Sequence, residues 1–146
     1  MTTLKLHLNN FLPYRLSVLS NKISQNIANL YETNFQISNQ EWRIIAILGE
    51  QADISAAEVA NRTAMDKVAV SRAVKKLLIT GKLERHFSNT DKRRSVLSLS
   101  ETGRSIYGQI IPLVKQYEQK LLSTLSSTEQ QNLDSLLKKL EYEQSN

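Results

Sequence analysis

Three predicted capping boxes of the form Ser-x-x-Glu dictate much of what this 146-residue chain can fold into. The pairs are Ser38/Glu41, Ser55/Glu58 and Ser126/Glu129, and an apolar residue precedes each serine. In such a capping box the serine hydroxyl accepts a hydrogen bond from an early helical N–H, and the glutamate accepts one from the serine's own N–H. Each pair therefore predicts the start of a helix. Gly49 and Gly81 stand where two helices should end, because glycine readily adopts the left-handed conformation.

Apolar spacing extends these starts into a mainly helical chain. The helices are predicted at about residues 9–32, 39–49, 56–62, 66–80, 101–125 and 127–143. Pro112 is expected to kink or locally break the fifth of them, since proline removes one backbone donor. Between Gly81 and Gly103 the apolar period changes to alternation, which predicts a small β-hairpin with its turn at residues 88–91. The fold class is therefore mainly α with one β-hairpin.

The terminal helices carry apolar stripes at helical spacing that one small central domain cannot cover alone. We expect these stripes to pack on each other and on a second copy of the chain; the alternative is a monomeric helical bundle. The candidate dimerisation residues are Phe11, Leu12, Leu121, Leu125, Leu133, Leu136, Leu137 and Leu140.

Composition excludes several function classes. With no cysteine the chain has no disulfide, thiol switch or thiolate metal site. No apolar run approaches the roughly 20 residues of a membrane span, and the first residues lack the order of a secretion signal, so a cytoplasmic location is expected. His7 and His86 have no metal-type spacing partner, and no catalytic motif is present. We therefore expect no membrane, metal or cofactor, and no enzyme.

The positive charge is concentrated between Arg62 and Arg94. These 33 residues hold ten Lys and Arg against three acidic residues, whereas the remainder holds nine basic and eleven acidic residues. The segment runs from the end of the first short central helix, through the second, to the turn of the hairpin. A cationic patch on such a scaffold is suited to the phosphate backbone of duplex DNA.

The helix that begins after Asp66 is the predicted DNA-reading element. Its buried stripe is Val70, Val74, Leu77 and Leu78, and its outward residues are Lys67, Val68, Ser71, Arg72, Lys75 and Lys76. The Arg72 guanidinium can pair bidentately with guanine. Ser71 can bond a base or phosphate, and the methyl groups of Val68 or Ala69 can meet a thymine methyl. Lys67, Lys75 and Lys76 suit phosphates; the alternative for the whole set is an ordinary solvated helix face.

The hairpin adds further cations. Its tip reads Asp91-Lys92-Arg93-Arg94, and Arg85 lies on its first strand. A long arginine on a projecting turn can enter a narrow, A·T-rich minor groove. Asp91 is expected to brace one of the two arginines.

From about Phe11 to Tyr142 the chain resembles the MarR family of winged-helix transcription regulators. The matching segments are Ser55-Ala-Ala-Glu-Val-Ala, Asp66-Lys-Val-Ala-Val-Ser-Arg, Leu77 to Arg85, Asp91-Lys-Arg-Arg and Leu97-Ser-Leu-Ser-Glu-Thr-Gly-Arg104. The resemblance implies one domain over residues 1–146, with a winged helix-turn-helix at about 38–100 and a helical dimerisation region at about 1–32 and 101–146. It also implies a homodimer on a pseudo-palindromic duplex. Val68 and Ala69 depart from the small hydroxyl residues expected there.

Members of this family are commonly regulated by small aromatic anions, thiol oxidation or metal, and the absence of cysteine excludes oxidation of a thiol. Tyr14, Arg15, Trp42 and Arg43 are the candidate wall and cations of an effector pocket; the alternative is a core tryptophan with arginines in ion pairs. The predicted function is a dimeric, sequence-specific regulator of transcription, more often a repressor in this family. The alternatives are a non-specific architectural DNA-binding protein and a protein-interaction module.

Overall fold

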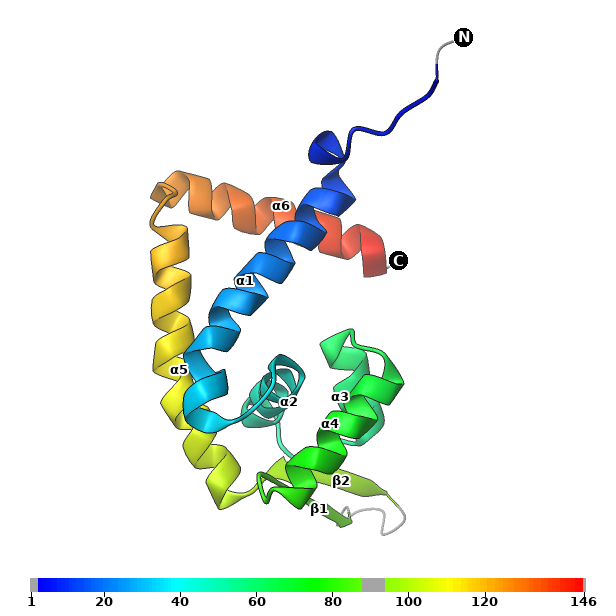
Figure 1. Ribbon diagram of the computed structural model, residues 1–146, viewed down its shortest axis with the longest axis vertical. Helices are drawn as coiled ribbons and strands as arrows, with labels where there is room; N and C mark the ends of the chain where they lie inside the picture. The colour runs from blue at the N-terminus through cyan, green and yellow to red at the C-terminus, as the bar shows by residue number, and fades with distance from the viewer. Residues whose placement is uncertain (1–2, 88–93, 146) are drawn as a thin grey trace. The chain divides into compact units, whose positions relative to one another are not determined.

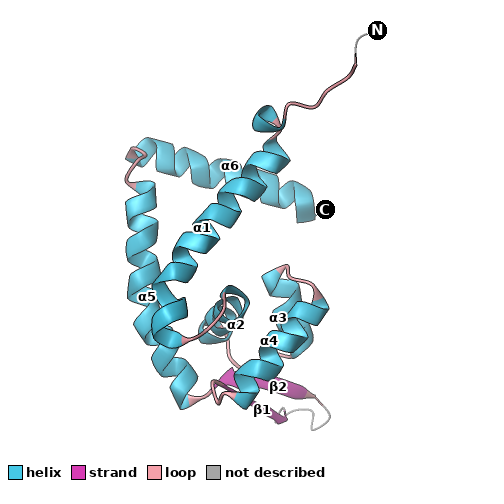
Figure 2. Ribbon diagram, viewed as in Figure 1, coloured by secondary structure: helices cyan, strands magenta, loops and turns pink. Residues whose placement is uncertain are grey.

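The computed structural model describes residues 3–87 and 94–145. In these ranges the chain is mainly helical with one antiparallel hairpin, which confirms the predicted fold class (Figures 1 and 2). The elements are η1 Leu8–Asn10, α1 Leu12–Phe35, α2 Asn39–Glu50, α3 Ala56–Thr63, α4 Lys67–Ile79, β1 Leu83–Phe87, β2 Ser95–Leu99, α5 Glu101–Leu122 and α6 Ser127–Ser145. Two compact units follow each other along the chain, one ending at Ile111 and one beginning at Pro112.

Two of the three predicted capping boxes form completely. At α2 the Ser38 N–H donates to Glu41 Oε1 at 3.1 Å, and the Glu41 N–H donates to Ser38 Oγ at 3.1 Å. At α6 the Ser126 and Glu129 pair makes the same two bonds, at 2.8 and 3.1 Å. These bonds to Ser126 lower the pKa of the Glu129 carboxyl below its usual value.

The box at α3 is only half formed, which corrects the prediction for Glu58. Ser55 Oγ accepts from the Glu58 N–H at 3.2 Å. The Glu58 carboxylate, however, pairs with the guanidinium of Arg94, which directly precedes β2 in the hairpin, or wing. A cationic partner gives this half-exposed carboxylate a stronger bond than one backbone N–H.

The predicted helix ends are partly wrong. Gly81 has φ 75° and follows α4 as expected, but Gly49 lies inside α2, which continues to Glu50. A Cβ atom on Gly49 would lie 2.4 Å from the Tyr107 ring, so this glycine serves close packing against α5. The left-handed residues that end α1 and α3 are Gln36 and Ala64, both at φ 55°.

α5 is one continuous helix through Pro112, so of the predicted kink or local break the break does not occur. A proline removes only its own bond, here to the carbonyl of Gly108 four residues earlier, and the other helical bonds remain. The helix ends at Leu122 rather than near residue 125.

The core of the first unit lies where α2, α3, α4 and the hairpin meet. α2 contacts α3, α4 and β2, while α4 contacts β1. Ile44 and Ile45 of α2, Leu77 of α4 and Leu97 of β2 are almost fully buried. Val70 and Val74 complete the predicted stripe of α4, with Leu78 half-buried at its edge. This packing fixes the direction in which the opposite face of α4 points.

The hairpin pairs Leu83 with Leu99 and Arg85 with Leu97. A bridge between Ile54 and Leu97 places the loop before α3 against the other side of β2, which the sequence pattern did not indicate. The Asp53 N–H donates to the Leu97 carbonyl at 3.0 Å, and the Leu97 N–H donates to the Ile54 carbonyl at 2.8 Å. The loop before α3 is therefore anchored to the edge of β2 that does not pair with β1.

An aromatic series joins α1, α2 and α5. The Trp42 ring lies between Tyr31 and Tyr107, with ring centroids 5.8 and 6.3 Å away. The Tyr31 hydroxyl donates to Asn39 Oδ1 at 2.8 Å. Burial raises the pKa of Tyr31 to about 12, so the hydroxyl keeps the proton that it donates at neutral pH. Across the described residues, no helix is long and apolar enough to cross a bilayer.

Candidate nucleic-acid interface

α3, a short turn and α4 form a helix-turn-helix. Ala64 in the left-handed conformation turns the chain after α3. Asp66 then caps α4, because its Oδ1 accepts from the Ala69 N–H at 2.9 Å. The predicted cap is therefore present, and it satisfies one of the first backbone N–H groups of α4.

The outward face of α4 is defined by the residues that it buries. Val70, Ala73, Val74 and Leu77 face the core. At about 100° per residue, the line opposite them carries Val68, Arg72 and Lys75. All three are exposed, and Val68 is 59% exposed. This face, together with Lys67 and Ser71 beside it, is hereafter the reading face.

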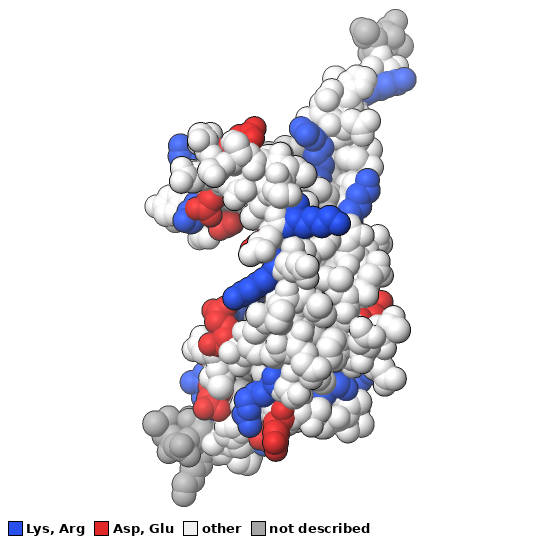
Figure 3. All heavy atoms as spheres, turned by 90° about the vertical axis from the view of Figure 1, so that its left-hand side faces the viewer, with Lys and Arg blue, Asp and Glu red and all other residues white. Residues whose placement is uncertain are grey.

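The cations of the reading face are available to a ligand. Lys67, Arg72 and Lys75 form no ion pair with any residue in the described part of the chain, and neither does Arg85 on β1. By contrast, Arg62 at the end of α3 pairs with Glu50 at 2.9 Å and also donates to Gln51. Clustered unpaired cations raise the local positive potential, which favours a polyanion. On the face drawn in Figure 3, basic and acidic side chains are mixed.

A groove of about 520 Å³ lies on one side of α4. Small and apolar residues of α3 and α4 form its floor, and Lys67, Ser71, Lys75 and Arg85 contribute to its lining. A smaller hollow of about 300 Å³ lies on the other side, where α4 meets the start of α2. Ala69, Arg72 and Lys76 line that hollow together with Glu41. Arg85 and the reading face therefore belong to one continuous surface.

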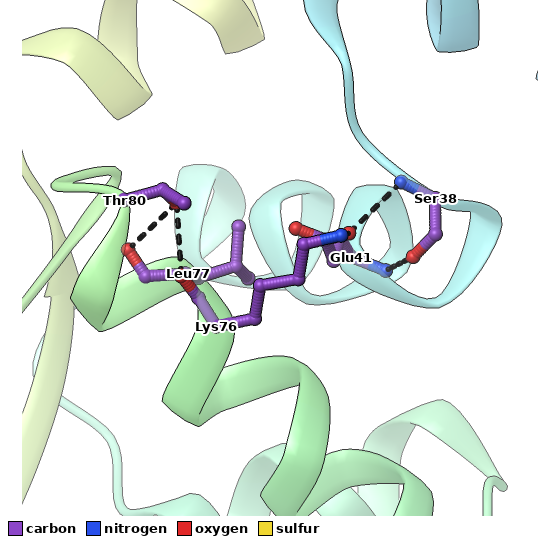
Figure 4. A network of polar contacts seen from close by, with 5 residues as sticks. All are labelled: Ser38, Glu41, Lys76, Leu77 and Thr80. Atoms are coloured by element: carbon purple, nitrogen blue, oxygen red, sulfur yellow. Dashed lines mark hydrogen bonds and ion pairs between the residues drawn. The ribbon is translucent and has the colours of Figure 1, made fainter.

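Lys76, one of the predicted phosphate contacts, pairs with an acidic residue of α2. Its Nζ lies 3.4 Å from Oε1 of Glu41, whose side chain is only 2% exposed (Figure 4). Glu41 completes the capping box of α2, so this pair joins the first turn of α2 to the last turn of α4. The sequence identified Glu41 as a cap but carried no signal that it would be buried against α4.

Two side chains of the wing form ion pairs or hydrogen bonds with residues outside it. Arg94 pairs with Glu58 of α3. His86 on β1 contacts Asp53, with Nε2 and Oδ1 2.8 Å apart. The tip residues Asp91, Lys92 and Arg93 lie outside the described residues. The described part of the wing thus presents Arg85 to solvent and uses Arg94 and His86 for contacts to the loop and helix beside it.

A tight junction follows the wing. The Ser100 hydroxyl donates to the Gly81 carbonyl at 2.6 Å and accepts from the Gly103 N–H at 3.0 Å. A Cβ atom on Gly103 would lie 2.1 Å from the Lys82 carbonyl oxygen. Only glycine fits this approach, which links the end of α4 to the start of α5. The motif Ser-Glu-Thr-Gly was part of the sequence resemblance, and this contact is its physical reason.

The four candidate effector residues do not meet at one point in the described chain. Trp42 stacks in the aromatic series, and Arg43 Nη2 donates to Ser24 at 3.4 Å. Tyr14 and Arg15 lie in the first turn of α1, roughly 25 Å along that helix from Tyr31 at 1.5 Å per residue. None of the four lines the groove or the hollow described above. Among the described residues no group of three His, Cys, Asp or Glu is placed to hold a metal ion.

A helix-turn-helix followed by an antiparallel hairpin, with free cations on the outward side of its second helix, defines a winged helix-turn-helix protein. Residues 35–94 match the model of the MarR family. The HTH-type transcriptional regulator BilQ of Clostridium symbiosum is 31% identical over 96 residues, covering 66% of this chain and 67% of that protein. The chain therefore belongs to the MarR family of transcriptional regulators.

Solved structures agree over nearly the whole chain. A crystal structure of a MarR/EmrR family transcriptional regulator from Acinetobacter sp. ADP1 superposes with a TM-score of 0.87 at 30% identity, covering 96% of this chain and 99% of that one. The S. aureus MepR–DNA complex has the same fold, with a TM-score of 0.79 at 21% identity over 90% of this chain and 96% of that one.

Proposed function

We propose that this MarR-family regulator is a homodimeric repressor that binds a specific pseudo-palindromic DNA duplex. The observation that carries the proposal is Arg72, which lies exposed on the reading face and pairs with no acidic residue of the described chain. A guanidinium in that position can donate two parallel hydrogen bonds to guanine O6 and N7 in the major groove. The fold is shared with MepR, which has been solved bound to DNA.

Each side chain then has a separate role. Arg72 reads a base pair, whereas Lys67 and Lys75 neutralise phosphates, and Ser71 donates to a base or phosphate. Arg85 extends the cationic surface along the wing. The wing tip, including Lys92 and Arg93, is proposed to enter the flanking minor groove.

The dimer is supported by the apolar surface that the single chain leaves exposed. α6 buries none of its residues, although Leu133, Leu136, Leu137 and Leu140 form a continuous stripe that is 38–58% exposed. Phe11 and Leu12 near the start of α1 are 40% and 48% exposed. A helix that leaves such a stripe in water gains little from folding, since helices depend on packing of their apolar face. A second copy supplies the missing surface, and the predicted interface also includes Leu121 and Leu125.

We also propose that a small aromatic anion acts as an effector, and we assign it no binding site. Arg43 and Trp42 are held by contacts within the first unit, and Tyr14 and Arg15 belong to the exposed first turns of α1. Fluorescence titration of Trp42 with a series of aromatic carboxylates tests this element directly, because Trp42 is the only tryptophan of the chain.

The experiment that tests the function is selection of bound fragments from the source genome, followed by affinity measurements on the enriched duplex and its single-base variants. The wild type should prefer the enriched duplex, and Arg72→Ala should lose discrimination at one base pair per half-site by about 1–3 kcal/mol. Deleting the gene should raise transcription from promoters that carry the site. Equal affinity for every fragment, with uniform protection along the DNA, would instead identify an architectural DNA-binding protein.

A further inference from the structure

Val68 is the one apolar side chain that projects from the first two turns of α4. It is the second residue of the helix and is 59% exposed. Lys67, Ser71 and Arg72 around it are polar and exposed. Ala69, the other apolar residue of this turn, is half-buried and lines the hollow beside Glu41. Of the two methyl-bearing candidates, only Val68 therefore stands on the reading face.

An isolated exposed valine is ordinary on a protein surface, so its position carries the argument. A helix docked in the major groove meets base edges with its N-terminal residues, and Val68 is in that part of α4. The C5-methyl group of thymine is the apolar feature that base edges present in this groove. A β-branched side chain in a helix also occupies one strongly preferred rotamer, so Val68 loses little freedom when it makes such a contact.

We infer that Val68 selects a thymine by contacting its C5-methyl group next to the base pair read by Arg72. The two residues are one helical turn apart, or about 6 Å along the axis. Base pairs rise about 3.4 Å along the duplex. The thymine therefore lies within about two base pairs of the guanine. This inference rests on the proposed function and names the sequence preference of the same site.

The test removes the methyl group from the DNA while the protein stays unaltered. In the duplex that wild-type protein selects, each thymine is replaced in turn by deoxyuridine, which keeps the base-pairing edge and the O4 acceptor. At one thymine per half-site, within two base pairs of the Arg72-dependent guanine, the replacement should weaken binding about three- to fivefold. That factor corresponds to burial of one methyl-sized group at about 0.8 kcal/mol.

Three variants assign the effect to Val68. Val68→Ala should bind the thymine and deoxyuridine duplexes with affinities that differ less than twofold. Val68→Ile keeps an apolar, β-branched side chain and should retain the wild-type sensitivity. Ile79→Ala is the matched control, because Ile79 is 74% exposed but is the last residue of α4, away from the base-reading end. It should leave the sensitivity to deoxyuridine unchanged.

The possible failures are distinguishable. A wild-type protein that selects a duplex but tolerates deoxyuridine at every thymine overturns the inference and leaves the proposed function intact. Equal sensitivity in wild type and Val68→Ala overturns it as well, since another residue then makes the methyl contact. A protein that selects no duplex overturns the proposed function together with the inference.

Discussion

Nζ of Lys76 on α4 lies 3.4 Å from Oε1 of Glu41 on α2, whose side chain is 2% exposed. The same glutamate oxygen accepts the Ser38 N–H that begins α2. Oε2 of Glu41 is buried and has no hydrogen-bond partner among the described residues. One carboxylate therefore caps α2 and also holds the helix that carries the reading face.

Replacing Lys76 with methionine should destabilise the protein, because it leaves a buried carboxylate without its cation. Loss of one partner of a buried polar pair costs about 1–3 kcal/mol. The lower end is expected here, since the Lys76 side chain is 62% exposed and solvent already screens part of the attraction. Urea unfolding followed by far-UV circular dichroism measures the change in the free energy of unfolding.

Lys75→Met is the matched control for Lys76→Met. Lys75 is an exposed neighbour with no ion pair in the described chain, so its replacement should change stability by less than about 0.5 kcal/mol. Glu41→Gln combined with Lys76→Met should recover most of the loss, because glutamine can still cap α2 and leaves no buried charge. Equal stability of the two lysine variants would show that the pair contributes nothing.

For the salt dependence of DNA binding, Lys75→Met should have the larger effect and Lys76→Met the smaller one. Each phosphate neutralised contributes about 0.9 to the slope of log K against log salt concentration. Lys75→Met should therefore reduce that slope by about 1.8 in a dimer that makes the contact twice. Lys76→Met should leave the slope nearly unchanged, since its charge is already balanced by Glu41. Fluorescence anisotropy with the selected duplex over a range of salt concentrations provides the measurement, and a reduced slope for both variants would show that Lys76 leaves Glu41 on binding.

The helix starts could be predicted from the sequence because capping is a local interaction. Ser38, Ser55, Asp66 and Ser126 all precede helices at the expected residues, and the change of period identified the hairpin. The helix ends were less predictable. Ala64, for example, adopts a left-handed conformation that its side chain does not favour, so tertiary packing rather than local preference sets it.

The contacts that hold the wing join residues that are far apart in sequence. Glu58 and Arg94 are 36 positions apart, and Asp53 and His86 are 33 apart. The pattern Ser-x-x-Glu predicts that the Glu58 carboxylate caps α3. Nothing in the local sequence predicts that this carboxylate pairs with Arg94 of the wing instead. The sequence therefore assigns each cation to a helix or strand. Only the folded structure shows which cations are paired: Lys76 and Arg94 have acidic partners, whereas Arg72 and Lys75 have none among the described residues.

Gly103→Ala should destabilise the junction that follows the wing. The new methyl group would approach the Lys82 carbonyl to 2.1 Å, a contact that requires backbone movement. Overpacking of this kind costs about 1–3 kcal/mol. Gly108→Ala on the same helix is the control, because a Cβ atom there meets nothing within 4 Å and alanine favours a helix by about 1 kcal/mol. Thermal unfolding of both variants should move in opposite directions, and a Gly103→Ala protein as stable as the wild type would contradict the contact.

Polar substitution of the α6 leucine stripe should separate the proposed dimer into monomers. Leu133, Leu136 and Leu140 lie on the exposed stripe of α6, at 38%, 58% and 45% exposure. Changing all three to glutamine removes the apolar surface that a second copy would cover, while glutamine retains good helix propensity. Light scattering after size exclusion should then report monomers where the wild type is dimeric. Affinity for the full operator should fall more than affinity for an isolated half-site, because one protein copy can hold only one half-site of a duplex whose half-sites are about 34–36 Å apart. Replacement of Asp134, Lys138 and Lys139 of the same helix by glutamine is the matched control, since these charged residues lie off the leucine stripe, and this variant should remain dimeric. A triple leucine variant that stays dimeric would place the interface elsewhere.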